Sequence, residues 1–73
     1  MKTITTNQLD LIRKQYPVGT IVKLILMEDV HAPKKGTTGK VFYIDDTGTI
    51  HVKWENGSTL GILFGVDRIE RVE

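Results

Sequence analysis

The chain has 73 residues, with ten Lys or Arg against nine Asp or Glu, two His and no Cys. A chain of this length forms one domain, residues 1–73, and without Cys it forms no disulfide and offers no thiolate to a metal, so we expect no metal and no cofactor. Its nearly balanced charge is not that of a dedicated polyanion binder, and its longest apolar run, LILM, is too short to span a bilayer. With no signal peptide in view either, we expect a cytoplasmic protein that contacts no membrane and is a monomer or a weak homo-oligomer.

The first predicted element is a helix over about residues 6–15. Thr5 at the N-cap and Gln8 three residues later form a capping-box sequence, in which each side chain covers the other residue's free backbone N–H. Ile4 and Leu9 stand at the two positions of a hydrophobic staple. We expect this helix to pack against one end of the rest of the domain; a partner-binding helix is the alternative.

The remainder of the chain, about residues 18–73, changes to the two-residue period of β-strands. The segment 49–55 alternates clearly, with Ile50, Val52 and Trp54 on one face, so we expect Trp54 in the core. Segments rich in β-branched and aliphatic residues predict five strands, at 20–27, 38–45, 49–55, 58–64 and 68–72.

Glycine-containing turns separate these strands. The sequences of 45–48 and of Asn56-Gly57 predict tight hairpin turns, the second of type I′ with positive φ at both residues. Gly61 lies inside the fourth predicted strand, where glycine marks a bulge or bend, and Gly65 lies at the end of that strand. Each of these residues therefore has a structural role to fill before any role in binding.

Five short strands joined by such turns predict a mainly β fold, a small, strongly bent antiparallel barrel with one short N-terminal helix. One connection, residues 28–37, is longer than a hairpin turn requires. Long loops of this kind often carry function, so we expect a partner to contact it.

Two stretches, YPVGTIVKLILMED and PKKGTTGKVFYIDDTGTIHVKWENGSTLGILFGVDRI, resemble the bacterial and phage-borne family called domain of unknown function 4314. The resemblance implies an SH3-like barrel and a frequent home in mobile genetic elements, with no reaction and no ligand. VKWENGST and LFGVD also resemble, more weakly, the Mind-bomb-type SH3-like modules. Phe64 stands where those modules have Tyr, and Gly65 follows it with no Arg between, so their peptide binding is not carried over.

Catalytic chemistry has few candidate residues. Asp45 and Asp46 are adjacent in a predicted turn, where we expect them to support the turn and solubility. His51 has no nucleophile or carboxylate nominated beside it by the sequence, and we expect a surface His. Asp67 follows a turn and is expected to accept hydrogen bonds from that turn's backbone N–H groups, with a ligand contact as the alternative. We therefore predict that the chain is not an enzyme.

Basic residues form the most suggestive surface pattern. Two lie in the long connection and three on the second and third predicted strands, where we expect them on the outer face: Lys34, Lys35, Lys40, His51 and Lys53. The acids Glu55, Asp45 and Asp46 lie on the same hairpin, so an ordinary solvated face is the alternative.

Three functions are open at this point. The first is a small protein-interaction or accessory module from a phage or other mobile element, whose partner contacts the 28–37 loop and the outer face. The second is a nucleic-acid-binding module that resembles KOW-type domains. The third is a phage counter-defence protein that binds a host protein or a nucleotide.

Overall fold

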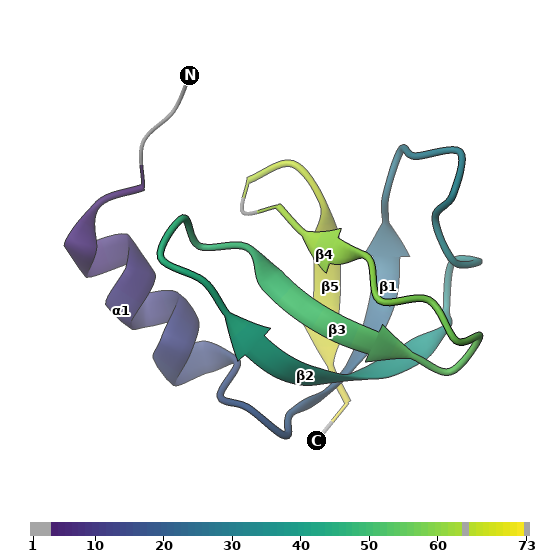
Figure 1. Ribbon diagram of the computed structural model, residues 1–73, viewed down its shortest axis with the longest axis horizontal. Coiled ribbons are helices and arrows are strands. Elements are labelled where there is room, and N and C mark those ends of the chain that lie inside the picture. The colour runs from purple at the N-terminus through teal and green to yellow at the C-terminus, as the bar shows by residue number, and fades with distance from the viewer. Residues whose placement is uncertain (1–3, 64, 73) are drawn as a thin grey trace.

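The computed structural model describes residues 4–63 and 65–72. Figure 1 shows one helix beside a curled sheet. Phe64, placed by its sequence at the end of the fourth strand, lies outside the described residues. The elements are α1 (Thr6–Gln15), β1 (Ile21–Leu26), β2 (Thr38–Ile44), β3 (Ile50–Trp54), β4 (Gly61–Ile62) and β5 (Arg68–Arg71).

All five strands belong to one antiparallel sheet with the order β4-β3-β2-β1-β5. In Figure 1 the sheet curls so that β1 and β5 lie behind β3 and β4, with β2 running across the bend. The predicted mainly β fold of five antiparallel strands and one short helix is confirmed. Closure into a barrel would need β4 to meet β5, and the described pairings do not include that step, so the SH3-like barrel stays a prediction.

The helix α1 begins and ends where its sequence indicates. The Thr5 hydroxyl accepts from the backbone N–H of Gln8, and the Gln8 side chain accepts from the N–H of Thr5, so the predicted capping box is confirmed. Ile12 is 2% exposed and belongs to the core, while Ile4 and Leu9 pack against that core. In the structure α1 is thus a packing helix.

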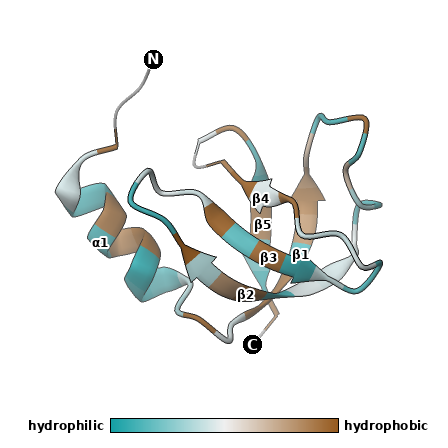
Figure 2. Ribbon diagram, in the orientation of Figure 1, coloured by the Kyte–Doolittle hydropathy of each residue, from teal (hydrophilic) through white to brown (hydrophobic). Residues whose placement is uncertain are grey.

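The core lies inside the curl of the sheet, and the helix contributes Ile12 to it. Ile50, Val52 and Trp54 of β3 are buried while the residues between them face outward, an alternation that Figure 2 shows along this strand. Trp54 is 3% exposed, as predicted, and its indole N–H donates to the Leu60 carbonyl at 3.0 Å. Gly39 of β2 pairs with Trp54, and a Cβ at Gly39 would lie 2.9 Å from the indole ring, so only glycine leaves room for it.

The fourth strand is shorter than its sequence suggests. Of the predicted segment 58–64, only Gly61 and Ile62 pair with β3. Of the two alternatives at Gly61, the bulge is absent, because the pairing of Gly61 with His51 runs without a register shift, and the bend stays a prediction. A Cβ at Gly61 would instead lie 2.6 Å from the Thr49 methyl carbon, so the glycine is explained by a close approach to the neighbouring strand.

The two hairpin turns that flank β3 have one backbone form. Gly48 donates to the carbonyl of Asp45, and Gly57 donates to the carbonyl of Trp54. Each of these glycines has positive φ, as in a three-residue loop built from a type I turn followed by a glycine. The predicted type I′ turn at Asn56-Gly57 is therefore wrong, because every positive φ among the described residues belongs to a glycine.

Candidate functional site

A β-bulge in β2 creates the most unusual surface of the described residues. Val41 pairs with Val52, but the next pair joins Tyr43 to His51, so Phe42 is an extra residue in its strand. Because a bulge breaks the strict alternation of side chains, Phe42 and Tyr43 both remain exposed, at 38% and 54%. Together with Lys40, His51 and Lys53 they make up what we call the aromatic face.

The side chains of the aromatic face form a row. The Lys53 ammonium lies 5.2 Å from the centroid of the Phe42 ring, within the range of a cation–π contact. The His51 ring follows, 6.0 Å from Phe42 and 5.5 Å from Tyr43 between centroids, and tilted against both. The row thus places a cation at one end and an exposed phenol ring at the other.

The lysines of this face lie directly opposite each other. Lys40 of β2 pairs with Lys53 of β3, and like charges at opposed positions destabilise a sheet. On the neighbouring strands the pairing has opposite charges, with Lys23 of β1 facing Glu70 of β5. Within the described residues the salt bridges are Arg13 with Asp46 and His51 with Asp45, so neither Lys40 nor Lys53 has a carboxylate within bridging distance there.

Asp45 ends the row on the side of the β2–β3 turn. Its carboxylate accepts from the Thr47 hydroxyl and backbone N–H and from the Thr49 N–H, and it lies 2.9 Å from His51 Nε2. Hydrogen bonds from Thr47, then from His51, hold the pKa of the Asp45 carboxyl well below its usual range. The sequence nominates no carboxylate beside His51, and the structure supplies one: Asp45, six residues earlier in the chain, holds the ring of this half-buried histidine.

The 28–37 loop lies at the opposite end of β2 from this carboxylate. The Asp29 carboxylate accepts from the His31 N–H, Pro33 is buried, and Thr37 donates to the Lys34 carbonyl in a turn that contains Gly36. Lys34 and Lys35 are exposed in that turn. Because β2 starts here, Lys34 and Lys35 lie at the same end of the sheet as Lys40 and Lys53, which stand near the start of β2 and the end of β3.

Asp67 takes the structural role that its position predicts. Its carboxylate accepts from the backbone N–H of Leu63 at 2.9 Å across the turn that leads into β5. Gly65 in that turn has a φ of 81°, the left-handed region that favours glycine. Both residues are accounted for by the turn.

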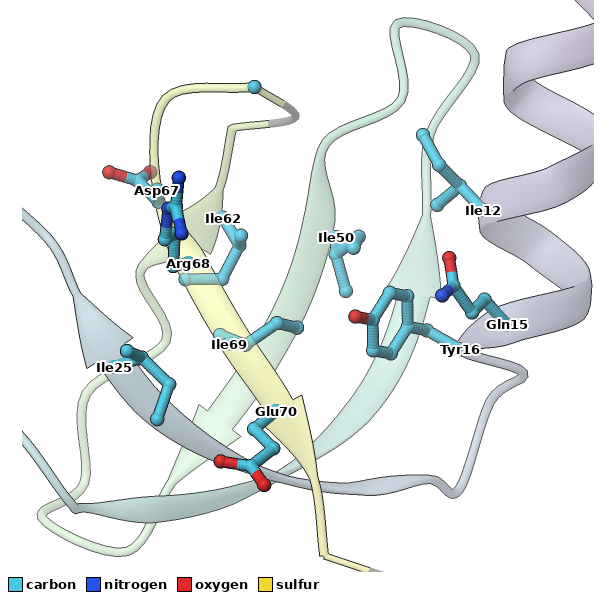
Figure 3. Close-up of a pocket in the computed structure, with 11 residues that line it drawn as sticks. Ile12, Gln15, Tyr16, Ile25, Ile50, Ile62, Asp67, Arg68, Ile69 and Glu70 are labelled. Carbon is cyan, nitrogen blue, oxygen red and sulfur yellow. The ribbon is translucent and has the colours of Figure 1, made fainter.

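A groove lies on the inner side of the sheet, away from the aromatic face. It has a volume of about 440 Å³, and Figure 3 shows Ile12, Tyr16, Ile50, Ile62 and Ile69 pointing toward it between α1, β3 and β5. Charged side chains, those of Asp67, Arg68 and Glu70, stand at its rim. The groove is thus an apolar opening onto the core with no set of polar groups converging inside it.

Neither place gathers ligands for a metal. Among residues 4–63 and 65–72, no group of three His, Asp or Glu side chains is close enough to hold an ion. No helix in the described part of the chain is long and apolar enough to cross a membrane.

The comparison with protein families decides where the chain belongs. The model of the family described as a domain of unknown function, DUF4314, matches residues 5–72, which include α1 and every strand. The chain belongs to the DUF4314 family. No curated protein and no solved structure matches it.

Sequence reasoning placed this DUF4314 domain's basic residues correctly on the surface but missed two members of the site. Phe42 and Tyr43 were assigned only to a strand, in which one of two adjacent side chains should point inward. The available signal was the adjacent aromatic pair itself, since one strand face cannot bury both. Where the bulge would fall was decided by the pairing with β3.

Proposed function

We propose that this DUF4314 domain is a non-enzymatic binding module, and that its partner contacts the aromatic face. The observation that carries the proposal is the bulge that leaves Phe42 and Tyr43 exposed side by side. Aromatic side chains are enriched in the contact surfaces of proteins, where they provide a large apolar area at small entropic cost. A bulge that re-aims a side chain at a sheet surface is itself a common feature of functional sites.

The surroundings of His51 support a binding role over catalysis. A histidine that acts as a general base needs the group that it deprotonates within hydrogen-bond reach. The hydrogen bond that the His51 side chain makes among the described residues goes to Asp45, whose carboxylate also closes the β2–β3 turn, and the ring lies between Phe42 and Tyr43. The pair therefore serves to fix the histidine ring between the two aromatic rings.

The 28–37 loop extends the proposed surface toward Lys34 and Lys35. Topology brings the start of β2 and the end of β3 to the same end of the sheet, so Lys34 and Lys35 lie at the end of the sheet that is nearer to Lys40 and Lys53 than to Asp45. Buried Pro33 anchors the loop, and a test should therefore change the two lysines to Gln and leave Pro33 in place. The proposed setting, a phage or other mobile element, rests on the sequence resemblance.

Site-specific photo-crosslinking tests the proposal. A photoreactive phenylalanine analogue replaces Tyr43 on the aromatic face, and in a matched control it replaces Leu11, which is 64% exposed on α1. In bacterial lysate we expect a discrete covalent adduct, with a protein or with a nucleic acid, from position 43 and none from position 11. Adducts of equal yield from both positions, or none from either, would contradict the aromatic face as the binding surface.

A further inference from the structure

We infer that the aromatic face binds single-stranded nucleic acid, with a base stacked on Tyr43 and phosphates near Lys40 and Lys53. This inference rests on the proposed function, because it takes the same face as the binding surface. It adds the chemical class of the partner, which the exposed rings alone leave open between protein and nucleic acid.

The charge of the aromatic face favours an anionic ligand. Lys40 and Lys53 face each other across paired strands, an arrangement that folding alone disfavours. An anionic ligand between the two ammonium groups would offset that repulsion, and each phosphodiester of a nucleic acid carries one negative charge on its two non-bridging oxygens. Lys34 and Lys35 are exposed in the loop that leads into β2, at the same end of the sheet.

The aromatic face places a cation next to a ring. The Lys53 ammonium is 5.2 Å from the centre of the Phe42 ring. In a nucleotide the sugar joins the flat base to the charged phosphate, so one nucleotide can contact a ring and a cation that lie side by side. Proteins that hold single strands combine these elements, a positive track for the backbone and aromatic rings on which successive bases stack.

Two acidic residues lie near the aromatic face, Asp45 and Glu55. Asp45 lies beyond His51, and its carboxylate is occupied by donors from Thr47, Thr49 and His51. Glu55 is exposed, but it lies in the turn that follows β3. The part of the face that carries Lys40 and Lys53 is therefore the part farthest along β2 from Asp45.

The site is small and favours single strands over duplexes. Lys40 and Tyr43 are three positions apart, which is about 10 Å along a strand at ~3.3 Å per residue. That length accommodates about two nucleotides, comparable to the bases stacked by the sheet aromatics of RNA-binding domains. In a duplex each base is already stacked between its neighbours, so no base face is free to stack on the Tyr43 ring.

Fluorescence anisotropy with labelled oligothymidylate, oligouridylate and a blunt DNA duplex is the test, performed at low salt with the full chain. We expect both single strands to bind more tightly than the duplex. Tyr43→Leu keeps an apolar side chain but removes the stacking face, and should weaken binding roughly 5- to 150-fold. Tyr43→Phe, which keeps the ring, should bind like the wild type.

The lysines give a second, independent readout. Replacing Lys40 and Lys53 together by Gln should lower the salt slope, the dependence of log affinity on log salt, by about 1.4 for a single strand. Lys14→Gln, on the last turn of α1, is the matched control and should leave the slope unchanged. Buried Trp54 reports by its emission that each variant is folded.

Distinct outcomes separate this inference from the proposed function. Absence of binding to any oligonucleotide at low salt, with a protein adduct still formed from position 43, overturns the nucleic-acid inference and leaves the binding module standing. Equal affinity for duplex and single strands, or affinity that is unchanged by Tyr43→Leu, overturns the stacking arrangement. Failure of both experiments overturns the proposed function as well.

Discussion

The two hairpin turns at the ends of β3 share a backbone and differ in almost everything else. In both, a glycine of positive φ donates to the carbonyl three residues earlier. In the β2–β3 turn, which lies beside α1 in Figure 1, Gly48 is buried, and a Cβ there would run into the Ile4 side chain. In the β3–β4 turn, Gly57 is exposed with open space around it.

The side chains of the two turns differ in how many partners they bind. In each turn a side-chain oxygen accepts from the backbone N–H of the residue after the glycine: Asp45 accepts from Thr49, and Asn56 accepts from Ser58. The hydrogen bond to Ser58 is the one that the Asn56 side chain makes among the described residues, whereas the Asp45 carboxylate also binds Thr47 and His51. The β3–β4 turn is thus held by contacts within itself, while the β2–β3 turn also contacts the helix and the aromatic face.

Substituting the two glycines should give the largest difference. Gly48→Val forces a β-branched residue into positive φ and drives its Cβ into the Ile4 side chain, so we expect a loss of about 2–4 kcal/mol in unfolding free energy. Gly57→Val meets only the backbone strain and should cost about 1 kcal/mol. Urea unfolding followed by Trp54 fluorescence measures both; equal losses would remove the distinction between the turns.

Removing the two turn acceptors should give the next largest difference. Asp45→Ala leaves two backbone N–H groups and His51 without their partner, and should cost about 1–3 kcal/mol. Asn56→Ala frees only the exposed N–H of Ser58 and should cost about 0.5 kcal/mol. The same unfolding measurement applies, and a larger loss for Asn56→Ala would contradict the account of Asp45.

Acid should weaken the Asp45 turn selectively. Because the pKa of Asp45 is lower in the folded chain than in the unfolded one, its contribution is fully present above the unfolded value, about 3.9. That contribution falls as the pH drops below this value toward the depressed folded pKa. We therefore expect the wild type to lose more unfolding free energy between neutral pH and about pH 3 than Asp45→Asn does. Parallel pH profiles for the two proteins would contradict the depressed pKa.

The ion pair between helix and turn should give the smallest effect. Arg13 of α1 lies 3.2 Å from Asp46 in the β2–β3 turn, and both side chains are exposed. Arg13→Gln should therefore cost no more than about 1 kcal/mol, and added salt should reduce the difference from the wild type. Lys14→Gln, one residue along the helix, is the control. A loss that persists at high salt would indicate packing by the Arg13 stem.

The fold was predictable from sequence where few residues decide it. The capping box of Thr5 and Gln8, the alternation along β3 and the glycines at the turns each act within a few positions, and the elements they predict are present. The turn type at Asn56-Gly57 was not predictable with the same certainty, because one glycine serves a two-residue or a three-residue loop. The loop has three residues because the backbone N–H of Trp54, at the end of β3, donates to the carbonyl of Ser58, four residues later.

By itself, the sequence determined that this DUF4314 domain has one helix at its start and a mainly antiparallel β structure after it, with Trp54 inside. Only the tertiary structure decided that Phe42 and Tyr43 share a surface, that Asp45 holds His51, and that Gly48 packs beneath Ile4. The physical reason is the range of the interactions. A cap or an alternating strand is fixed by neighbours in the chain, whereas a bulge exists only in relation to the partner strand against which its register shifts.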